Sequence, residues 1–207
     1  MLYFLVGPSG VGKDSVLDVI KKHDFDNKQP IIVAHRYITR PPRQNDEDHI
    51  ELTRIDFKNR KESGLFLFHW KSHGYRYGIG KEVLQWLEAG HDVIINGSRK
   101  YIHKAQESYP DLQIIWLTVS EEILRERLIQ RGRESKKEIE ARIARTLTMD
   151  PSKPRSSKTI HNDQSIEKTV QEIIDLIDAD TNARKEIGQA TEKGAGKNYK
   201  QESEELV

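Results

Sequence analysis

The residues best suited to chemistry lie close to the N-terminus, in the segment GPSGVGKD at positions 7–14. The segment follows the apolar run 2–6 and precedes the helical pattern 15–20, which predicts a strand, a glycine-rich loop and a helix in succession. Glycines leave backbone N–H groups free to face an anion, the helix adds the positive end of its dipole, and Lys13 adds a mobile charge. We therefore predict that a nucleoside triphosphate binds here. The alternative is a glycine-rich turn that happens to precede a helix. The predicted binding residues are Gly7, Pro8, Ser9, Gly10, Val11, Gly12, Lys13, Asp14 and Ser15.

The position after Lys13 carries Asp14, where the usual loop of this kind has a Ser or Thr whose hydroxyl binds Mg²⁺. A carboxylate is a better Mg²⁺ ligand than a hydroxyl, but it adds negative charge beside the phosphates. Either Asp14 contacts the metal directly or Ser15 takes over this role, and the sequence leaves both open.

The composition suits one domain with a core of ordinary size, because the chain has 207 residues of which 35% are apolar. The absence of cysteine excludes disulfides and thiolate metal sites and fits a reducing cytoplasm. We expect neither a membrane span, which needs roughly 20 apolar residues, nor a signal peptide. The net charge of +1 gives no sign of a nucleic-acid partner. The oligomeric state stays open, with a homodimer as one option.

Apolar runs alternate with helical patterns along most of the chain. Buried strands are predicted at 31–34, 93–95, 114–119 and 158–162, and helices at 81–89, 100–108, from 121 with Ser120 as the N-cap, and at 165–177. Ligands of open parallel sheets bind beyond the carboxyl ends of the strands. Asn96 and Ser98 follow such a strand end and are therefore site candidates, although they could equally form the turn into the next helix.

Residues 35–80 are rich in arginine, histidine and aromatic residues, and we interpret them as a small lobe inserted between core strands. Arg40 and Arg43 can each fork onto phosphate oxygens, while tyrosines and histidines offer donors around a polyhydroxylated substrate. Thr53, with an acid three residues later, is typical of a helix start. The alternative to an anion-binding wall is a solvated basic loop.

Residues 125–148 combine a helical pattern, a break at Gly132 and a second helical pattern, with arginines on both sides. This arrangement is typical of a lid that closes over a triphosphate. Arg131 and Arg142 are our candidates for neutralising charge on a transferred phosphoryl group, together with Lys13. For Arg125 and Arg127, ordinary surface ion pairs are an equal alternative. From residue 181 to 207 the apolar pattern fades, and we expect a charged, disordered tail.

Several blocks together resemble the guanylate-kinase-like kinases, over nearly the whole chain up to the tail. They are the glycine-rich loop, TRPPR at 39–43, HW at 69–70 with YRYG at 75–78, and RGRE at 131–134 with Arg142. The resemblance implies an α/β fold of the P-loop NTPase type, with three α/β/α layers and a parallel central sheet. It further implies a single kinase domain over residues 1–180, with an acceptor-binding lobe and a helical lid. The cofactors would be ATP and Mg²⁺, and the enzyme would be cytoplasmic.

Four positions depart from the guanylate kinase pattern. The base in guanylate kinases is read by a Ser four residues before the first arginine, by a Glu before the Trp, and by an acid after the central strand. The matching residues here are Arg36, His69 and roughly Ser98, and His49 replaces a tyrosine that helps to hold the acceptor phosphate. A guanine site needs hydrogen-bond acceptors, and losing such partners greatly reduces discrimination. The replacements suit a sugar with phosphates at both ends.

The retained residues Arg40, Arg43 and Tyr77 would still hold one phosphate of the acceptor. The resemblance thus implies phosphorylation of ribose 1,5-bisphosphate by ATP, giving 5-phospho-α-D-ribose 1-diphosphate during organophosphonate use. A nucleoside monophosphate kinase of the guanylate type with a rearranged base pocket is the first alternative. A binding module that has abandoned catalysis is the second, although such a module would be expected to lose Lys13 or the lid arginines.

Overall fold

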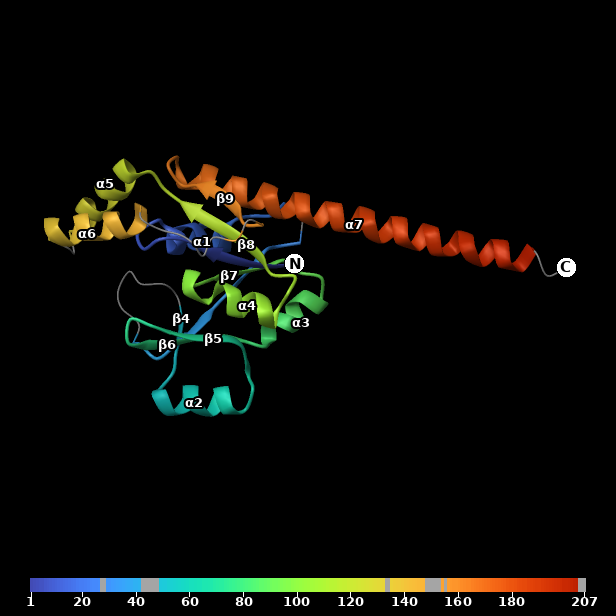
Figure 1. Cartoon of the computed structure of the whole chain (residues 1–207), viewed down its shortest axis with the longest axis horizontal. Coiled ribbons are helices and arrows are strands. Elements are labelled where there is room, and N and C mark those ends of the chain that lie inside the picture. Colours follow the sequence, from blue (N-terminus) through green and yellow to red (C-terminus); the bar gives the residue numbers. More distant parts are fainter. Residues whose placement is uncertain (27–28, 42–48, 133–134, 148–153, 155, 205–207) are drawn as a thin grey trace. The chain divides into compact units, whose positions relative to one another are not determined.

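The computed structural model describes residues 1–26, 29–41, 49–132, 135–147, 154 and 156–204. Its central sheet has five strands in the order β2-β7-β1-β8-β9, and each neighbouring pair is parallel (Figure 1). The strands are β1 (Leu2–Val6), β2 (Ile32–Ala34), β7 (Val93–Asn96), β8 (Gln113–Thr118) and β9 (Lys158–His161). All the strands predicted from the apolar runs are therefore present.

Helices connect these strands and cover both faces of the sheet. The chain leaves β1 through α1 (Lys13–Lys22) toward one edge, and it leaves β7 through α4 (Ile102–Ser108) toward the other. Because crossovers between parallel strands are right-handed, α1 and α4 lie on opposite faces. Figure 1 shows α4 and α3 (Glu82–Glu88) on the side of the sheet that faces the inserted lobe. The three-layer arrangement that the resemblance implied is confirmed.

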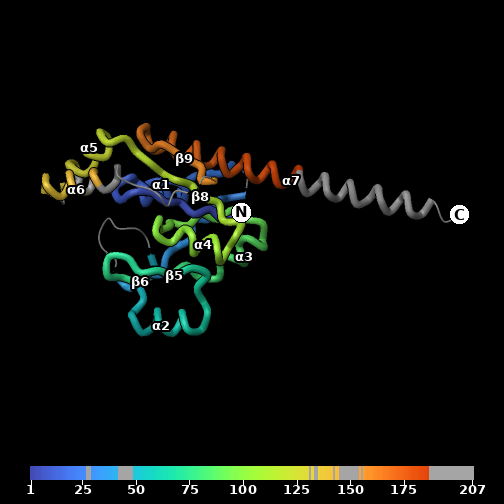
Figure 2. The backbone as a smooth tube through the Cα atoms, viewed as in Figure 1, coloured from blue at the N-terminus to red at the C-terminus, as the bar shows by residue number. Residues whose placement is uncertain are grey.

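The lobe predicted at residues 35–80 contains a second sheet, which the sequence analysis did not foresee. Its four strands lie in the order β4-β3-β6-β5. Between β4 and β5 lies α2 (Arg54–Glu62), and Figure 2 traces this excursion of the backbone. The predicted helix start is confirmed, since the Thr53 hydroxyl accepts a hydrogen bond from the Asp56 N–H at 3.0 Å. The strands are β3 (Arg36–Ile38), β4 (His49–Glu51), β5 (Phe66–Ser72) and β6 (Tyr75–Gly80).

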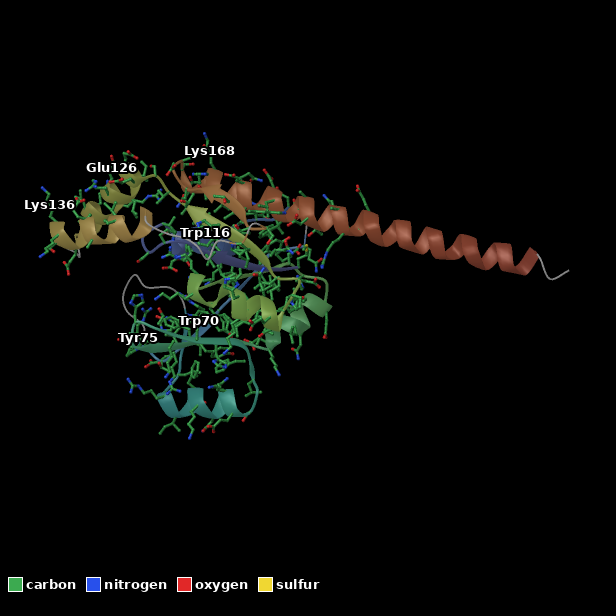
Figure 3. The ribbon with its side chains drawn as sticks, viewed as in Figure 1. Trp70, Tyr75, Trp116, Glu126, Lys136 and Lys168 are labelled. Atoms are coloured by element: carbon green, nitrogen blue, oxygen red, sulfur yellow. The ribbon has the colours of Figure 1, made fainter. Side chains whose placement is uncertain are left out.

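The lobe is joined to the central sheet by aromatic packing. Phe4 of β1 is fully buried, and its ring lies edge-on to Phe68 at 5.9 Å and to Trp70 at 6.4 Å. Trp70 in turn stacks on Tyr77 with ring centroids 5.6 Å apart. Figure 3 labels Trp70 on the lobe. These rings belong to one hydrophobic cluster shared by both sheets, which fixes the lobe against the strands that carry the glycine-rich loop.

The predicted lid consists of α5 (Glu121–Arg131) and α6 (Lys136–Leu147). The break between them is confirmed, because Gly132 ends α5 in the left-handed conformation with φ 60°. The prediction that Ser120 is the N-cap residue of α5 is confirmed. Ser120 occupies the N-cap position, but its hydroxyl makes no capping bond, and its backbone N–H donates to the Asp163 carboxylate at 2.6 Å.

The last helix, α7 (Ile166–Glu204), is longer than the 165–177 segment that the sequence indicated. The segment from 181 to 204, expected to be disordered, is helical in the structure. Its alanine, lysine, glutamate and glutamine residues are strong helix formers, and the segment lacks proline. The chain divides into two compact units, residues 1–170 and 171–207. Across the described ranges, no helix has both the length and the apolar character needed to cross a membrane.

The shared aromatic cluster predicts the effect of truncating Phe4. Phe4→Ala should lower the free energy of unfolding by about 3–5 kcal/mol, because it removes a buried ring and leaves a cavity. Chemical denaturation measures this change. Ile55→Ala, at a side chain that is 74% exposed, is the control and should change stability by less than about 0.5 kcal/mol. Equal losses in the two variants would show that Phe4 does not join the sheets.

Candidate active site

Two glycines shape the glycine-rich loop, one through a close contact with the backbone of β8 and one through a left-handed conformation. A Cβ atom on Gly7 would lie 2.3 Å from the carbonyl oxygen of Leu117 in β8, which only glycine avoids. Gly12 is the N-cap of α1 and has φ 94°, a left-handed conformation that disfavours other residues. The loop therefore passes tightly from β1 to the positive end of α1, as the sequence predicted.

Lys13 folds back over this loop. Its Nζ donates hydrogen bonds to the carbonyl oxygens of Gly7 and Pro8, both at 3.1 Å. Burial lowers the pKa of Lys13 to about 8; the Asp14 carboxylate opposes this shift, while the charges of Arg36 and Arg99 add to it. Lys13 therefore lies in cationic surroundings that a bound anion would balance.

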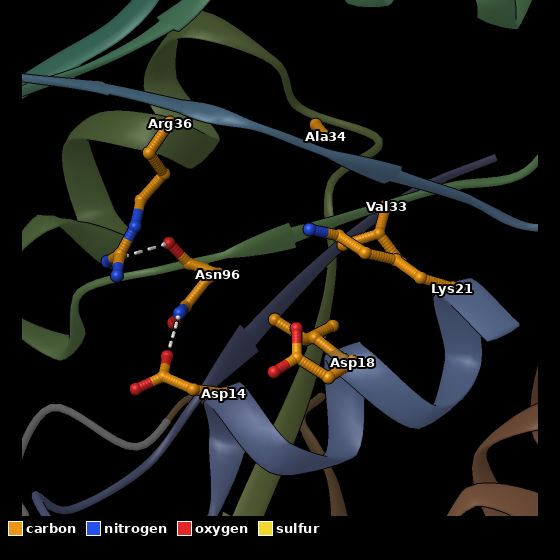
Figure 4. Close-up of a pocket in the computed structure, with 8 residues that line it drawn as sticks. Asp14, Asp18, Lys21, Val33, Ala34, Arg36 and Asn96 are labelled. Atoms are coloured by element: carbon orange, nitrogen blue, oxygen red, sulfur yellow. Dashed lines mark hydrogen bonds between the residues drawn. The ribbon is translucent and has the colours of Figure 1, made fainter. Parts of the chain in front are cut away.

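Asp14 is connected to the end of β7. The Asn96 Nδ2 donates to the Asp14 Oδ1 at 2.6 Å, and the Arg36 Nη1 donates to the Asn96 carbonyl oxygen at 3.5 Å. All three residues line a small pocket with α1 and β2 (Figure 4). Asn96 is 5% exposed, and its buried Oδ1 has no hydrogen-bond partner in the part of the chain that the structure describes. The structure thus brings together Asp14, Asn96 and Arg36, which the sequence analysis had proposed separately.

Two arginines of the lobe lie over tyrosine rings of β6. The Arg36 guanidinium lies over the Tyr77 ring at 5.3 Å, and the Arg40 guanidinium lies over the Tyr75 ring at 5.9 Å. His49 is buried, and its Nε2 lies 2.9 Å from the carbonyl oxygen of Arg40. His49 therefore fixes the backbone beside Arg40.

His69 lies apart from this group. It pairs with Gly78 across β5 and β6, whereas its neighbour Trp70 pairs with Tyr77. Because paired residues share a face and successive residues alternate, the His69 side chain lies on the face opposite Tyr77. Burial, followed by the charges of Lys61 and Lys104, lowers the pKa of His69. The structure therefore does not bring His69 next to Arg36.

Ser98 lies in the turn after β7, where its carbonyl oxygen accepts a hydrogen bond from the Tyr101 N–H at 2.9 Å. Its hydroxyl makes no capping bond to the 3-10 helix Arg99–Tyr101 that follows. This is the turn role that the sequence analysis had kept as the alternative for Ser98.

Three predicted arginines are described incompletely or not at all. Arg43 lies outside the described residues, and for Arg131 at the end of α5 and Arg142 within α6 only the backbone belongs to the described part. Arg125 is an ordinary surface residue of the helix pair, because it binds Glu121 at 2.8 Å and also Glu140 of α6.

Asn162 is not among the site residues predicted from the sequence, and Arg127 is left open there between a lid role and a surface ion pair. Asn162 directly follows β9, and its Nδ2 donates to the carbonyl oxygen of Val11 in the loop at 2.8 Å. The Arg127 Nη2 donates to the carbonyl oxygen of Asn162, also at 2.8 Å, and its buried Nη1 has no partner among the described residues. The strand-end rule that selected Asn96 would have selected Asn162 too.

A metal ion at this site would depend on ligands beyond the protein. Within the ranges given above, no group of three or more His, Cys, Asp or Glu side chains could hold a metal ion. The oxygens available beside the loop are those of Asp14 and Ser15 at the start of α1. This donor set fits Mg²⁺, which usually binds through one or two protein oxygens together with substrate phosphates.

Comparisons with known proteins agree with this geometry. A family model described as guanylate kinase matches residues 1–180. The ribose 1,5-bisphosphate phosphokinase of Thiobacillus denitrificans is 41% identical, over 88% of this chain and 96% of that protein. The protein of the same name from Yersinia pestis is 41% identical, over 87% of this chain and 92% of its own length. The crystal structure of guanylate kinase from Anaplasma phagocytophilum superposes with a TM-score of 0.59 at 19% identity, covering 87% of this chain and 85% of that one, and so shares the fold.

The lowered pKa of Lys13 predicts how triphosphate binding depends on pH. Bound phosphates favour the charged ammonium, so they raise the pKa of Lys13 above its value of about 8 in the free protein. Affinity for ATP should therefore fall as the pH rises through about 8, and binding at a pH just above that value should take up protons. Calorimetry in two buffers of different ionisation enthalpy measures this uptake.

Lys13→Arg is the matched control, because a guanidinium stays protonated throughout this pH range. The variant should bind ATP without the uptake. Equal proton uptake in the wild type and in this variant would contradict the assignment to Lys13.

Proposed function

The chain belongs to the guanylate kinase family, and we propose that it transfers the γ-phosphoryl group of ATP to ribose 1,5-bisphosphate, giving 5-phospho-α-D-ribose 1-diphosphate. The placement of Arg36 carries this proposal. Its guanidinium lies between the loop and the lobe, bound to the Asn96 carbonyl oxygen and stacked over Tyr77. The two relatives named as ribose 1,5-bisphosphate phosphokinases support the same acceptor.

The chemistry of the site favours a phosphate over a purine base. A guanine site needs acceptors for the ring N–H and the exocyclic amine, whereas Arg36 offers donors alone. The guanidinium fork suits phosphate oxygens and keeps its charge at all relevant pH values. With Arg36 and Arg40 both on the lobe, the acceptor-binding wall matches a sugar that is charged at both ends.

The proposed reaction needs positioning and charge neutralisation more than acid–base chemistry. The loop N–H groups and Lys13 hold the β- and γ-phosphates of ATP. An oxygen of the acceptor's 1-phosphate attacks the γ-phosphorus in line, and the bond from that phosphorus to the β–γ bridging oxygen breaks, releasing ADP. Because the attacking oxygen is already ionised near neutral pH, we assign no general base.

Asp14 and Ser15 would hold Mg²⁺ against the phosphates, and the ion would supply charge neutralisation at the transferred group. Asp14 already accepts a hydrogen bond from Asn96, which holds its carboxylate beside the end of β7. Arg131 and Arg142 of the lid would add positive charge on the opposite side of the γ-phosphate.

A coupled assay for ATP-dependent formation of phosphoribosyl diphosphate tests the function directly. Lys13→Ala should reduce kcat/KM by roughly 10²–10³-fold, since it removes the charge that accompanies the transferred group. Lys58→Ala, at a side chain 64% exposed on α2, is the control and should behave as the wild type. Faster turnover of GMP than of ribose 1,5-bisphosphate would instead favour the nucleoside monophosphate kinase.

The proposed role of Arg36 predicts that its substitution changes KM for the acceptor and leaves KM for ATP unchanged. Arg36→Ser should raise KM for ribose 1,5-bisphosphate by roughly 10–100-fold, the range expected for losing charge-assisted hydrogen bonds. Arg36→Lys keeps the charge but loses the fork, so its KM should be intermediate.

Steady-state kinetics with each substrate varied in turn measure these effects. Arg54→Ser, at an exposed arginine that begins α2, serves as the matched control and should leave both KM values unchanged. An Arg36→Ser variant with wild-type KM for the acceptor would remove Arg36 from the binding wall.

A further inference from the structure

Asn162 is a buried polar residue directly after β9, the edge strand of the central sheet, and it forms a hydrogen bond with the glycine-rich loop. It follows β9, is 3% exposed, and donates from Nδ2 to the carbonyl oxygen of Val11 at 2.8 Å. We infer that Asn162 is a positioning residue, which fixes the peptide between Val11 and Gly12 so that the Gly12 N–H faces bound phosphate. The inference rests on the proposed binding of ATP by the loop, but not on the identity of the acceptor.

The geometry of the peptide bond explains how this contact orients the Gly12 N–H. In a planar trans peptide, the C=O of one residue and the N–H of the next point in opposite directions. Holding the Val11 oxygen against Asn162 therefore turns the Gly12 N–H away from Asn162. Within the described part of the chain, no hydrogen bond uses this N–H, so it is available to an anion.

The orientation of the Asn162 amide is itself determined. The Val11 carbonyl oxygen can only accept, so Nδ2 is the group that faces it, and the Thr169 hydroxyl then donates to Asn162 Oδ1 at 2.9 Å. The Asn162 backbone is held as well, since its N–H donates to the Thr118 carbonyl oxygen at 2.8 Å and its carbonyl oxygen accepts from Arg127 Nη2 at 2.8 Å. Because both hydrogen-bond partners of the side-chain amide are fixed, Nδ2 always donates to the Val11 carbonyl oxygen.

Steric fit shows that the loop and Asn162 are matched. A Cβ atom on Gly12 would lie 2.6 Å from Asn162 Nδ2, so any larger residue at position 12 would displace the amide. The glycine thus permits both the left-handed backbone, with φ 94°, and the close approach of Asn162.

Without this contact the peptide could rotate and present the Val11 carbonyl to the phosphates. A carbonyl oxygen repels phosphate oxygens, whereas a preoriented N–H attracts them without reorganisation on binding. We therefore expect Asn162 to affect the nucleotide and to leave the acceptor unaffected. Substitution of Thr169 should also weaken nucleotide binding, but by a smaller factor, because Thr169 acts on Val11 only through Asn162.

Calorimetric binding of ATP with Mg²⁺, in the absence of acceptor, tests the inference. Asn162→Ala should weaken ATP binding about tenfold, the value of one well-placed hydrogen bond in a low-dielectric site. Thr169→Val keeps the shape but loses the hydroxyl and should weaken binding by about threefold, while Thr169→Ser should restore wild-type affinity. In kinetics, KM for ATP should rise and KM for the acceptor should stay within about twofold of the wild type.

A second readout reports on the peptide itself and keeps the test decisive if Asn162→Ala folds poorly. In ¹⁵N NMR, ATP should shift the Gly12 amide resonance of the wild type and of Thr169→Ser, and Thr169→Val should need more ATP for the same shift. Asn59→Ala, at an exposed amide of α2, is the matched control and should titrate as the wild type.

A merely structural Asn162 would give another pattern. Its variants would melt at lower temperature but bind ATP with wild-type affinity when folded, which would overturn the inference. Failure of the wild type to bind ATP would instead overturn the proposed function, so the two failures can be told apart.

Discussion

Parallel pairing of β1 with β7 and β8 is the constraint on which the site depends. The register joins Leu5 to Asn96 and Val6 to Trp116, so the carboxyl ends of these strands lie at the same edge of the sheet. Each strand then delivers its next residues to the same edge of the sheet. The loop after β1 consequently meets Asn96 on one side, while β9, paired to β8, brings Asn162 to the other. A slip of one residue in this pairing would separate the groups that the loop needs.

Electrostatics at this edge explain why an anion belongs there. Lys13 shares its surroundings with the positive charges of Arg36 and Arg99, and Asp14 is the carboxylate that opposes them. Gathering like charges and burying an ammonium are unfavourable by themselves, which is why the pKa of Lys13 falls. Phosphates relieve both effects at once. The buried ammonium and the clustered positive charges, which are unfavourable without a ligand, therefore favour binding of a triphosphate. The Asp14 carboxylate offers an oxygen ligand to a divalent cation beside the phosphates.

Packing between the two sheets determines where the acceptor meets the nucleotide. Phe4, Phe68 and Trp70 form a common core, so the lobe packs directly against the central sheet. Only one residue, His35, separates β2 of the central sheet from β3 of the lobe. Arg36, directly after His35, is thereby placed beside Asn96. In the proposed function, this packing would let the small lobe hold a charged acceptor in line with the phosphate to be transferred.

The sequence by itself determined the strands of the central sheet and predicted phosphate binding, because strands, the glycine-rich loop and helix starts such as Thr53 are specified by neighbours along the chain. It also predicted that the arginines of the lobe bind an anion. Only the tertiary structure decided which candidates meet, since strand register puts Arg36 beside Asn96 and turns His69 to the opposite face. The position of Asn162 after a strand could be read locally, but its contact with Val11 could not: Val11 lies 151 residues away, and contacts over such separations depend on how strands align, which no short segment encodes.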